Sequence, residues 1–368
     1  MSMSYANVPH LFRRLIPLVL TLAAGGACAY ACTSAIFSRA VTADGTMMLW
    51  KHRDSGFKDN VVERVEGKEG ALTYVAVFNA SDRELKEAWI GVNEAGFAVM
   101  NTASYNLAPD TAAVKDREGE VMTLALRRCR RAADFTALLD SLIATGRPLG
   151  VQANFGVIDR DGGGMYVEAS DWSYTVFPLE EEKEGWMVRT NYSYSGGREG
   201  RLGVMRHTAA RHLISDAISE GTLCARTLTD TLSRSFYHAG SKRDLLHEGV
   251  RQTEDAGDLI VRRSSCSSTV IILPPGGAPE MLVSVGNPLL SEARRVTLDS
   301  IPPELRPIGA AGHSPLCDRV NALRDRVWHT RNSRGKWVID LDAYRRILRE
   351  LEERGLRRSP VAVSGVCD

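Results

Sequence analysis

The 368-residue sequence lacks several patterns that would assign it to a functional class directly. Its seven cysteines include no Cys-x-x-Cys pair, so neither a zinc knuckle nor a thioredoxin-type site is supported. Its 46 basic and 45 acidic residues leave a formal charge of +1, which gives no field to draw nucleic acid or an anionic membrane. The histidines lack His-Glu-x-x-His spacing, and there is neither an internal repeat nor a low-complexity segment. We therefore expect a globular protein with no nucleic-acid partner.

The N-terminus has the layout of an export signal. Arg13 and Arg14 precede an apolar run over residues 15–24, which is too short to span a bilayer, and the triplet Ala-Tyr-Ala occupies 29–31. Small residues at the first and third positions of such a triplet favour cleavage directly before Cys32. We expect residues 1–31 to be a signal peptide and the mature protein to be exported, periplasmic or extracellular, without a membrane span.

The alternative interpretation of this segment is a lipoprotein signal, in which Cys28 or Cys32 is acylated and anchors the chain. Such signals favour Leu three residues before the cysteine, whereas Gly25 and Ala29 stand at those positions here. The alternative function that goes with it is a non-catalytic, lipid-anchored binding protein. A free N-terminal Cys32 distinguishes the enzyme from that protein.

The rest of the chain alternates groups of strands with groups of helices. Hydrophobic periodicity predicts strands over 33–41, 46–50, 73–78, 88–92, 97–101, 154–158, 165–168, 174–178, 186–190, 268–273 and 281–285. It predicts helices over 121–145, 202–218, 222–235, 242–251 and 341–354. Strand groups on both sides of helix groups predict an α+β fold of two packed sheets with helices outside. Two C-terminal cysteines, Cys317 and Cys367, are a candidate disulfide pair.

An N-terminal cysteine carries two groups that amide cleavage needs. The thiol is the nucleophile, and the α-amine, with a reference pKa of about 7.7–8.0, can move the proton at neutral pH. The Asp44-Gly45 turn predicts a hairpin that returns Lys51 and Asp54 to the side of Cys32. There Asp54 would orient the amine, and a cation would hold the thiolate.

These motifs, in this order, resemble the choloylglycine hydrolase and penicillin acyl-transferase group of N-terminal-nucleophile hydrolases. The matching segments are Cys-Thr-Ser at 32–34, the 44–45 turn with the Lys-x-x-Asp ending at 51–54, the hairpin at 91–101, Val-Arg-Thr-Asn at 188–191, and the segments 267–270 and 285–288, which are like the closing strands of the penicillin acyl-transferase branch. The resemblance implies a four-layer αββα sandwich over residues 32–288. Residues 289–368 lie beyond it, and we expect them to form a helical C-terminal extension.

The resemblance also implies roles for individual residues. Cys32 would be the nucleophile and Asp54 the partner of its amine. Asn101 and Asn191 would donate to the oxyanion formed during attack. A later arginine supports the site in that group, and Arg206 matches it best, with Arg201 as the second choice.

What is attacked stays open at this level. The bile-salt branch has Arg where this chain has Lys51, and the two cations are not interchangeable at a bidentate site. We expect hydrolysis of a linear, non-peptide carbon–nitrogen amide bond in a small N-acyl amide through a thioester acyl-enzyme, with no metal or organic cofactor. Transfer of the acyl group to an amine is the alternative, and a homo-oligomer is left open.

Overall fold

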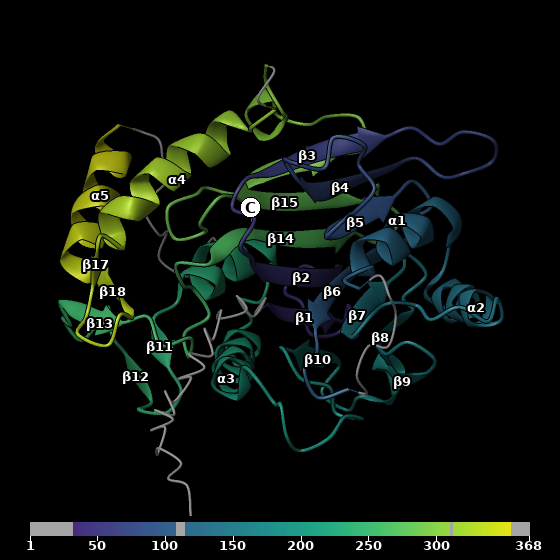
Figure 1. Ribbon diagram of the computed structural model, residues 1–368, viewed down its shortest axis with the longest axis horizontal. Coiled ribbons are helices and arrows are strands. Elements are labelled where there is room, and N and C mark those ends of the chain that lie inside the picture. Colours follow the sequence, from purple (N-terminus) through teal and green to yellow (C-terminus); the bar gives the residue numbers. More distant parts are fainter. Residues whose placement is uncertain (1–31, 108–114, 310–311, 355–368) are drawn as a thin grey trace, which may run out of the picture.

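The computed structural model describes residues 32–107, 115–309 and 312–354 (Figure 1). The predicted signal peptide, Cys28 and Cys367 lie outside these residues. Two large antiparallel sheets form the centre of the molecule. Among the described helices, none is long and apolar enough to cross a membrane.

The first sheet has six strands in the order β10-β1-β2-β14-β15-β16. Cys32 directly precedes its second strand, β1, which lies between β10 and β2. Every neighbouring pair is antiparallel. The strands are β1 (Thr33–Phe37), β2 (Met47–Asp54), β10 (Trp186–Arg189), β14 (Ser265–Leu273), β15 (Glu280–Val285) and β16 (Arg294–Thr297).

The second sheet has seven strands that follow one another in chain order. Each strand therefore pairs with its sequence neighbour through a short connection, except that α1 and α2 separate β6 from β7. The strands are β3 (Asn60–Val65), β4 (Tyr74–Asn79), β5 (Ile90–Asn93), β6 (Ala98–Ala103), β7 (Ala153–Ile158), β8 (Gly164–Ala169) and β9 (Tyr174–Pro178).

The two sheets pack face to face over one apolar layer. Ile36 and Leu49 from the six-stranded sheet belong to the same buried cluster as Val77 and Met100 from the seven-stranded sheet. The alternate residues Ala35 and Trp50 point the other way, into a separate cluster. This period of two assigns each strand residue to one face of its sheet.

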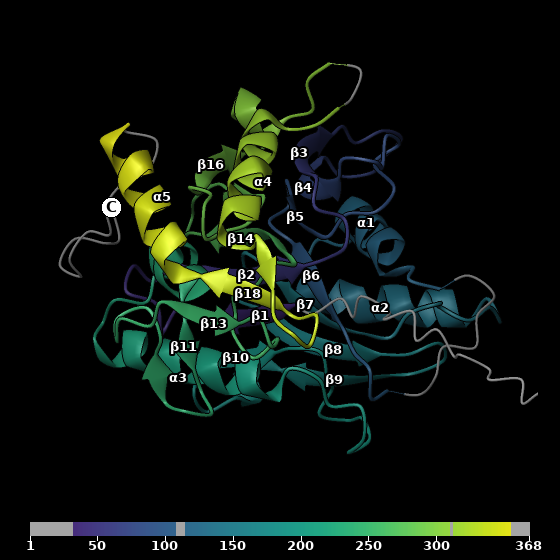
Figure 2. The same ribbon diagram turned by 60° about the vertical axis from the view of Figure 1, so that its left-hand side comes forward.

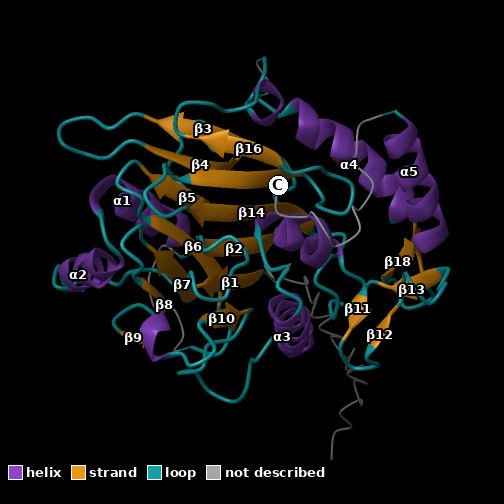
Figure 3. Cartoon of the chain, turned by 180° about the vertical axis from the view of Figure 1, so that it is seen from behind, coloured by secondary structure: helices purple, strands orange, loops and turns teal. Residues whose placement is uncertain are grey.

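Helices cover the outer face of each sheet. Figure 3 shows the strands, in orange, at the centre of the molecule and the helices, in purple, around them. The seven-stranded sheet is covered by α1 (Glu118–Arg128) and α2 (Ala132–Ile143), whose apolar residues join Phe155 and Val157 in one cluster. The six-stranded sheet is covered by α3 (Val204–Ser219) and by the short turns η2 (Thr227–Thr231) and η3 (Leu232–Arg234). The αββα prediction is confirmed.

The C-terminal region packs against the sandwich and shares its inter-sheet core. It contains both helices and strands: β16 extends the six-stranded sheet, and α4 (Pro315–Val327) and α5 (Leu341–Glu353) pack beside it (Figure 2). The smaller elements are η1 (Leu179–Glu181), β11 (Tyr237–His238), β12 (Arg243–Asp244), β13 (Gln252–Glu254), η4 (Pro303–Leu305), β17 (Thr330–Arg331) and β18 (Trp337–Asp340).

The helix predicted over residues 242–251 is wrong. Lys242 has a φ of 54°, and the Asp244 carboxylate accepts hydrogen bonds from the backbone N–H groups of Leu246 and His247 at 2.9 and 3.0 Å. A side chain that takes the backbone donors in this way competes with helix formation. The segment forms strand β12 and turns instead.

Candidate active site

Cys32 lies at the start of β1, where its side chain is buried with 5% of its surface exposed. The predicted hairpin is confirmed, because β1 pairs with β2 in a register that sets Thr33 opposite His52 and Ser34 opposite Lys51. The Cys32 thiol lies 4.0 Å from the backbone oxygen of Asp54, the last residue of β2. The end of β2 therefore borders the nucleophile.

Strand alternation sends the last four side chains of β2 to opposite faces of the sheet. Lys51 and Arg53 share the face of Leu49 and point toward the seven-stranded sheet, whereas His52 and Asp54 share the face of Trp50 and point toward α3. Charged groups therefore lie both above and below the strand beside Cys32.

Lys51 is buried between the sheets and contacts no carboxylate among the described residues. Its ammonium donates to the backbone oxygen of Trp89 and to Oδ1 of Asn101, both at 2.7 Å. Burial lowers the pKa of Lys51 to about 8, although the nearby Cys32 raises it. The ammonium is therefore mostly charged at pH 7 and in electrostatic contact with the thiol.

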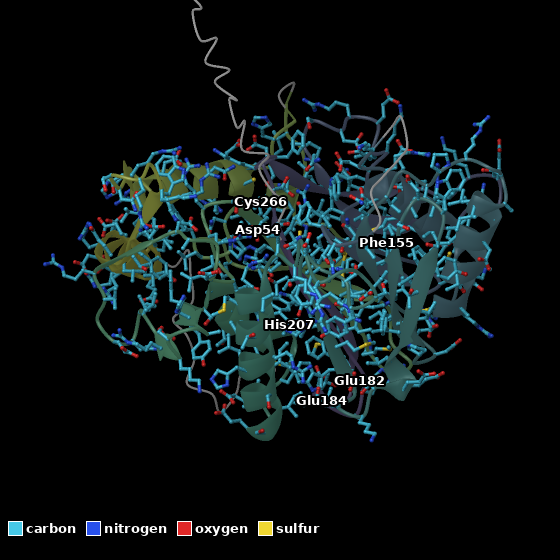
Figure 4. All side chains as sticks on the ribbon, turned by 60° about the horizontal axis from the view of Figure 1, so that its bottom comes forward. Asp54, Phe155, Glu182, Glu184, His207 and Cys266 are labelled. Carbon is cyan, nitrogen blue, oxygen red and sulfur yellow. The ribbon has the colours of Figure 1, made fainter. Side chains whose placement is uncertain are left out.

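Asp54 is held by groups that come from far along the chain. Its carboxylate forms a buried ion pair with Arg262 and accepts a hydrogen bond from Oγ of Ser265 at 2.5 Å. Figure 4 shows Asp54 beside Cys266, the residue that forms a bulge in β14. Arg262 and Ser265 were not among the site residues predicted from the sequence, because neither stands in a recognisable motif.

The hydrogen bonds around Ser265 identify the tautomer of His52. Oγ of Ser265 donates to Asp54 and accepts from the backbone N–H of Arg262 at 3.0 Å, so its contact with Nε2 of His52 at 2.8 Å needs a proton on that nitrogen. Burial lowers the pKa of His52 to about 4, against the pull of Asp54. His52 is thus a neutral imidazole with the proton on Nε2, and its buried Nδ1 has no hydrogen-bond partner in the described structure.

Arg206 reaches Cys32 from α3. Its Nη1 donates to the backbone oxygen of Cys32 at 2.6 Å and its Nη2 to Oδ1 of Asn191 at 2.7 Å. Burial, and then repulsion from Arg262, lowers the pKa of Arg206 to about 9, which leaves it charged at neutral pH. Arg201 is exposed and donates to the backbone oxygen of Gly197. The structure therefore brings Arg206, and not Arg201, to the nucleophile.

The two asparagines predicted to donate to the oxyanion contact two different cations of the site, Lys51 and Arg206. Oδ1 of Asn101 accepts from Lys51, a donor-only group, which turns the Asn101 amide nitrogen away from the ammonium. Nδ2 of Asn191 donates to the backbone oxygen of Ala103 at 2.9 Å while its oxygen faces Arg206. Both amides are thus oriented by cations, and their oxyanion role stays a prediction.

Arg53 is a second buried cation that sequence reasoning missed. It donates to Oδ1 of Asn60 at 2.6 Å and Oδ1 of Asn79 at 2.9 Å, and its guanidinium lies 4.6 Å from the ring centre of Trp89. All these partners are neutral. Arg53 and Lys51 together therefore place two positive charges in the space between the sheets near Cys32.

A group with metal-ligand chemistry lies outside this site. The ligand atoms of Asp59, His313 and Asp318 are all within 4.8 Å of one another. Asp59 and His313 also line a cleft that contains Lys58 and Arg83.

No family model matches the sequence, and no curated protein matches it. Solved structures do. The N-acylethanolamine-hydrolyzing acid amidase ortholog of Caenorhabditis elegans is 14% identical over 66% of this chain and 93% of its own, with a TM-score of 0.41. A mutant of conjugated bile acid hydrolase from Clostridium perfringens is 10% identical over 74% and 93%, with a TM-score of 0.42. Penicillin V acylase from Agrobacterium tumefaciens is 11% identical over 73% and 87%, with a TM-score of 0.38.

TM-scores of 0.38–0.42 are too low for a conclusion about this chain. Identity of 10–14% does not transfer residue roles. The function of each side chain therefore has to follow from the contacts of this chain alone.

Proposed function

We propose that this protein is an exported cysteine amidase that cleaves a linear amide bond with Cys32 as its N-terminal nucleophile. The observation that carries the proposal is the charge around this cysteine. Cys32 is within electrostatic reach of three buried cations, Lys51, Arg206 and Arg262. Reactive cysteines lie in electropositive surroundings of this kind.

Three other cysteines are buried. Burial raises the pKa of Cys129 to about 12, that of Cys266 to about 11 and that of Cys317 to about 12. Such thiols stay protonated at neutral pH and behave as small buried apolar groups. Cys317 is free among the described cysteines, and its predicted partner, Cys367, lies outside the described residues.

The reaction follows from the two groups of Cys32 once residues 1–31 are removed. The thiol gives its proton to the α-amine and attacks the amide carbon, forming a carbon–sulfur bond and a tetrahedral oxyanion. The oxyanion collapses, the carbon–nitrogen bond breaks, and the leaving amine takes the proton from the α-ammonium. Water then attacks the thioester, releasing the acid and restoring the thiol.

The surrounding side chains position these groups. Asp54, fixed by Arg262 and Ser265, supplies the negative charge that stabilises the α-ammonium between the two proton transfers. Arg206 fixes the Cys32 backbone, and Asn101 and Asn191 are the proposed oxyanion donors. Each such donor contributes about 10²–10³ in turnover.

Intact-mass analysis of the exported protein is the first test. A chain that begins with an unmodified Cys32 supports the proposal, whereas a start elsewhere, or an acyl group on Cys28 or Cys32, contradicts it and favours a lipid-anchored binding protein.

Activity is tested on N-acylethanolamines, N-acyl amino acids, penicillin V and conjugated bile salts. Cys32→Ser should lose amine release, and Cys129→Ser, in the outer helical layer, should keep it. If the wild type releases amine from none of these compounds, the amidase proposal fails. Acyl products formed with an added amine, at the expense of free acid, would instead identify a transferase.

A further inference from the structure

Asn154 is a buried asparagine that contacts the segments of both proposed oxyanion donors. It is the second residue of β7, has 0% of its surface exposed, and lies opposite Thr102 of β6. Its Nδ2 donates to Oγ1 of Thr102 at 3.0 Å, and Thr102 directly follows Asn101. A polar side chain at this depth lowers stability unless its hydrogen bonds are made, so its partners show which parts of the chain it holds.

Asn191 needs support from outside the sheet, because the ladder between β1 and β10 ends before it. The last pair of that ladder is Ser34 with Arg189, and the same register, continued by two residues, sets Asn191 opposite Cys32. The residues from Thr190 onward lie beyond the ladder. Their backbone carbonyl groups therefore need other donors.

Asn154 supplies these donors on both sides of Asn191. Its Nδ2 donates to the backbone oxygen of Thr190 at 3.1 Å and to that of Tyr192 at 3.2 Å. Its Oδ1 accepts from Oγ of Ser193 at 2.5 Å. The two N–H protons are shared among three acceptors, so the amide cannot turn without breaking several hydrogen bonds. One side chain thus holds the backbone before and after Asn191.

The neighbouring strand continues this support. Glu168 of β8 lies opposite Asn154, and its buried carboxylate accepts from the backbone N–H groups of Tyr194 at 2.9 Å and Ser195 at 2.7 Å. The charge of Glu168 is balanced by the guanidinium of Arg189 at 2.7 Å. The segment 190–195 is therefore attached to β7 and β8 along its length, and Asn154 holds the part that carries Asn191.

We propose that Asn154 is a positioning residue of the oxyanion site, which fixes the Asn191 amide relative to Cys32. The inference rests on the proposed amidase function and adds a residue that acts through Asn191 rather than on the substrate. Arg206 orients the Asn191 side chain, and Asn154 holds the backbone from which that side chain extends. An oxyanion donor is effective only when it is in place before the charge develops, so a shift of about 1 Å in this backbone should lower turnover up to about 10²-fold.

The test compares Asn154→Ala with Asn93→Ala, using whichever of the N-acylethanolamines, N-acyl amino acids, penicillin V and conjugated bile salts the wild type cleaves fastest. Asn93 is the matched control, because it is also 0% exposed and its Nδ2 donates to two backbone oxygens, those of Leu126 and Cys129, at 2.9 and 2.8 Å. These partners lie at the end of α1, outside the site. We expect Asn154→Ala to lower kcat about 10- to 100-fold with an unchanged KM, and Asn93→Ala to keep kcat although it also loses stability.

Combination with Asn191→Ala separates positioning from a general loss of structure. If Asn154 acts through Asn191, adding Asn154→Ala to Asn191→Ala should lower kcat by no more than about two- to threefold further, whereas independent effects multiply. Asn154→Asp is the second variant in case Asn154→Ala does not fold. It keeps the size of the side chain and the oxygen that accepts from Ser193 but loses the donating nitrogen, so it should show the same loss of kcat.

The outcomes separate this inference from the proposed function. Equal kcat losses in Asn154→Ala and Asn93→Ala, or the full additional loss in the double variant, overturn the positioning role and leave the amidase intact. Wild-type kcat in Asn191→Ala overturns it as well, because Asn191 is then no donor that needs positioning. If the wild type cleaves none of the compounds, the amidase proposal fails and the role of Asn154 fails with it.

Discussion

Arg262 and Asp54 form an ion pair across 208 residues of sequence, with 11% and 1% of their side-chain surfaces exposed. Burial acts against the charge of Arg262, but Asp54, with a smaller contribution from Asp255, outweighs it and raises the pKa of the guanidinium. The pair joins the end of β2 to the segment that enters β14. It thus fixes the carboxylate proposed to stabilise the Cys32 amine.

Removing one partner of this ion pair should lower the free energy of unfolding. Arg262→Gln leaves the Asp54 carboxylate buried without its cation, and we expect a loss of about 3–5 kcal/mol in the free energy of unfolding. Arg263→Gln is the control, because Arg263 pairs with the exposed Asp325 at 3.1 Å and should contribute about 1 kcal/mol or less. Urea unfolding of both variants measures the difference, and similar losses in the two would contradict a special role for Arg262.

This pair also shows what the sequence could and could not predict. The hairpin from Cys32 to Asp54 is local, so a turn signal and a strand period were enough to bring Lys51 and Asp54 to the cysteine. Arg262 and Ser265 reach Asp54 only because β14 pairs with β2, and no short-range pattern encodes that pairing. Arg262 and Ser265 precede the predicted strand 268–273 in a run of arginines and serines. Arginines in such a run are usually exposed surface residues.

Arg53 was missed for a related reason. It follows the predicted strand 46–50, and a charged residue at a strand end is usually exposed. Its burial depends on Asn60 and Asn79, which come from the other sheet. Only the packing of the two sheets makes this arginine part of the site. Arg206, in contrast, was predicted because the resemblance implies an arginine near the start of a helix, and helical periodicity over residues 202–218 favoured this one.

His52 should make stability depend on pH in the acidic range. Its pKa is about 4 in the folded protein and 6.5 in the unfolded chain. Between these values the unfolded chain binds a proton that the folded protein does not, so stability is lost as pH falls from 6.5 to 4. His52→Gln, which can still donate to Ser265, should remove up to about 3 kcal/mol of this dependence.

The measurement is guanidinium unfolding of wild type and His52→Gln at pH 7 and pH 4.5. The difference between the two proteins should change with pH in favour of the variant at the lower value. Curves that stay parallel would contradict a buried neutral imidazole at position 52. Exposed histidines titrate in both proteins and cancel from the comparison.

Lys51 should make stability depend on pH in the alkaline range. Its pKa falls from 10.5 in the unfolded chain to about 8 in the folded protein. Between pH 8 and 10.5 the unfolded chain binds the extra proton, so wild-type stability should rise with pH relative to Lys51→Met, by up to about 3 kcal/mol in total.

Turnover, unlike stability, should fall as pH rises above 8. If the ammonium holds the thiolate, turnover declines as Lys51 loses its proton above pH 8, and Lys51→Arg should shift this decline to higher pH because arginine stays charged. Unfolding curves at pH 7.5 and 10, together with the pH profile of kcat, test both statements. An alkaline limb that is identical in wild type and Lys51→Arg would exclude Lys51 as its origin.

The two terminal nitrogens of the Arg206 guanidinium hold groups on both sides of the nucleophile in place. Nη1 donates to the backbone oxygen of Cys32 at 2.6 Å and to Oγ1 of Thr33 at 3.1 Å, and Nη2 donates to Oδ1 of Asn191 at 2.7 Å. The compact ammonium of lysine cannot reproduce this planar pair of bonds. Arg206→Lys should therefore release Asn191 from its orientation at the nucleophile and lower kcat about 10- to 100-fold, the size of one or two such hydrogen bonds.

Arg201→Lys is the matched control, because Arg201 is exposed and contacts Gly197 and the ring of Tyr192 rather than Cys32. We expect its kcat to equal that of the wild type. A KM that stays constant in Arg206→Lys would indicate that the arginine acts on the reacting groups, since lost substrate binding raises KM instead. If Arg201→Lys lost as much activity as Arg206→Lys, the positioning role would not belong to the fork between Cys32 and Asn191.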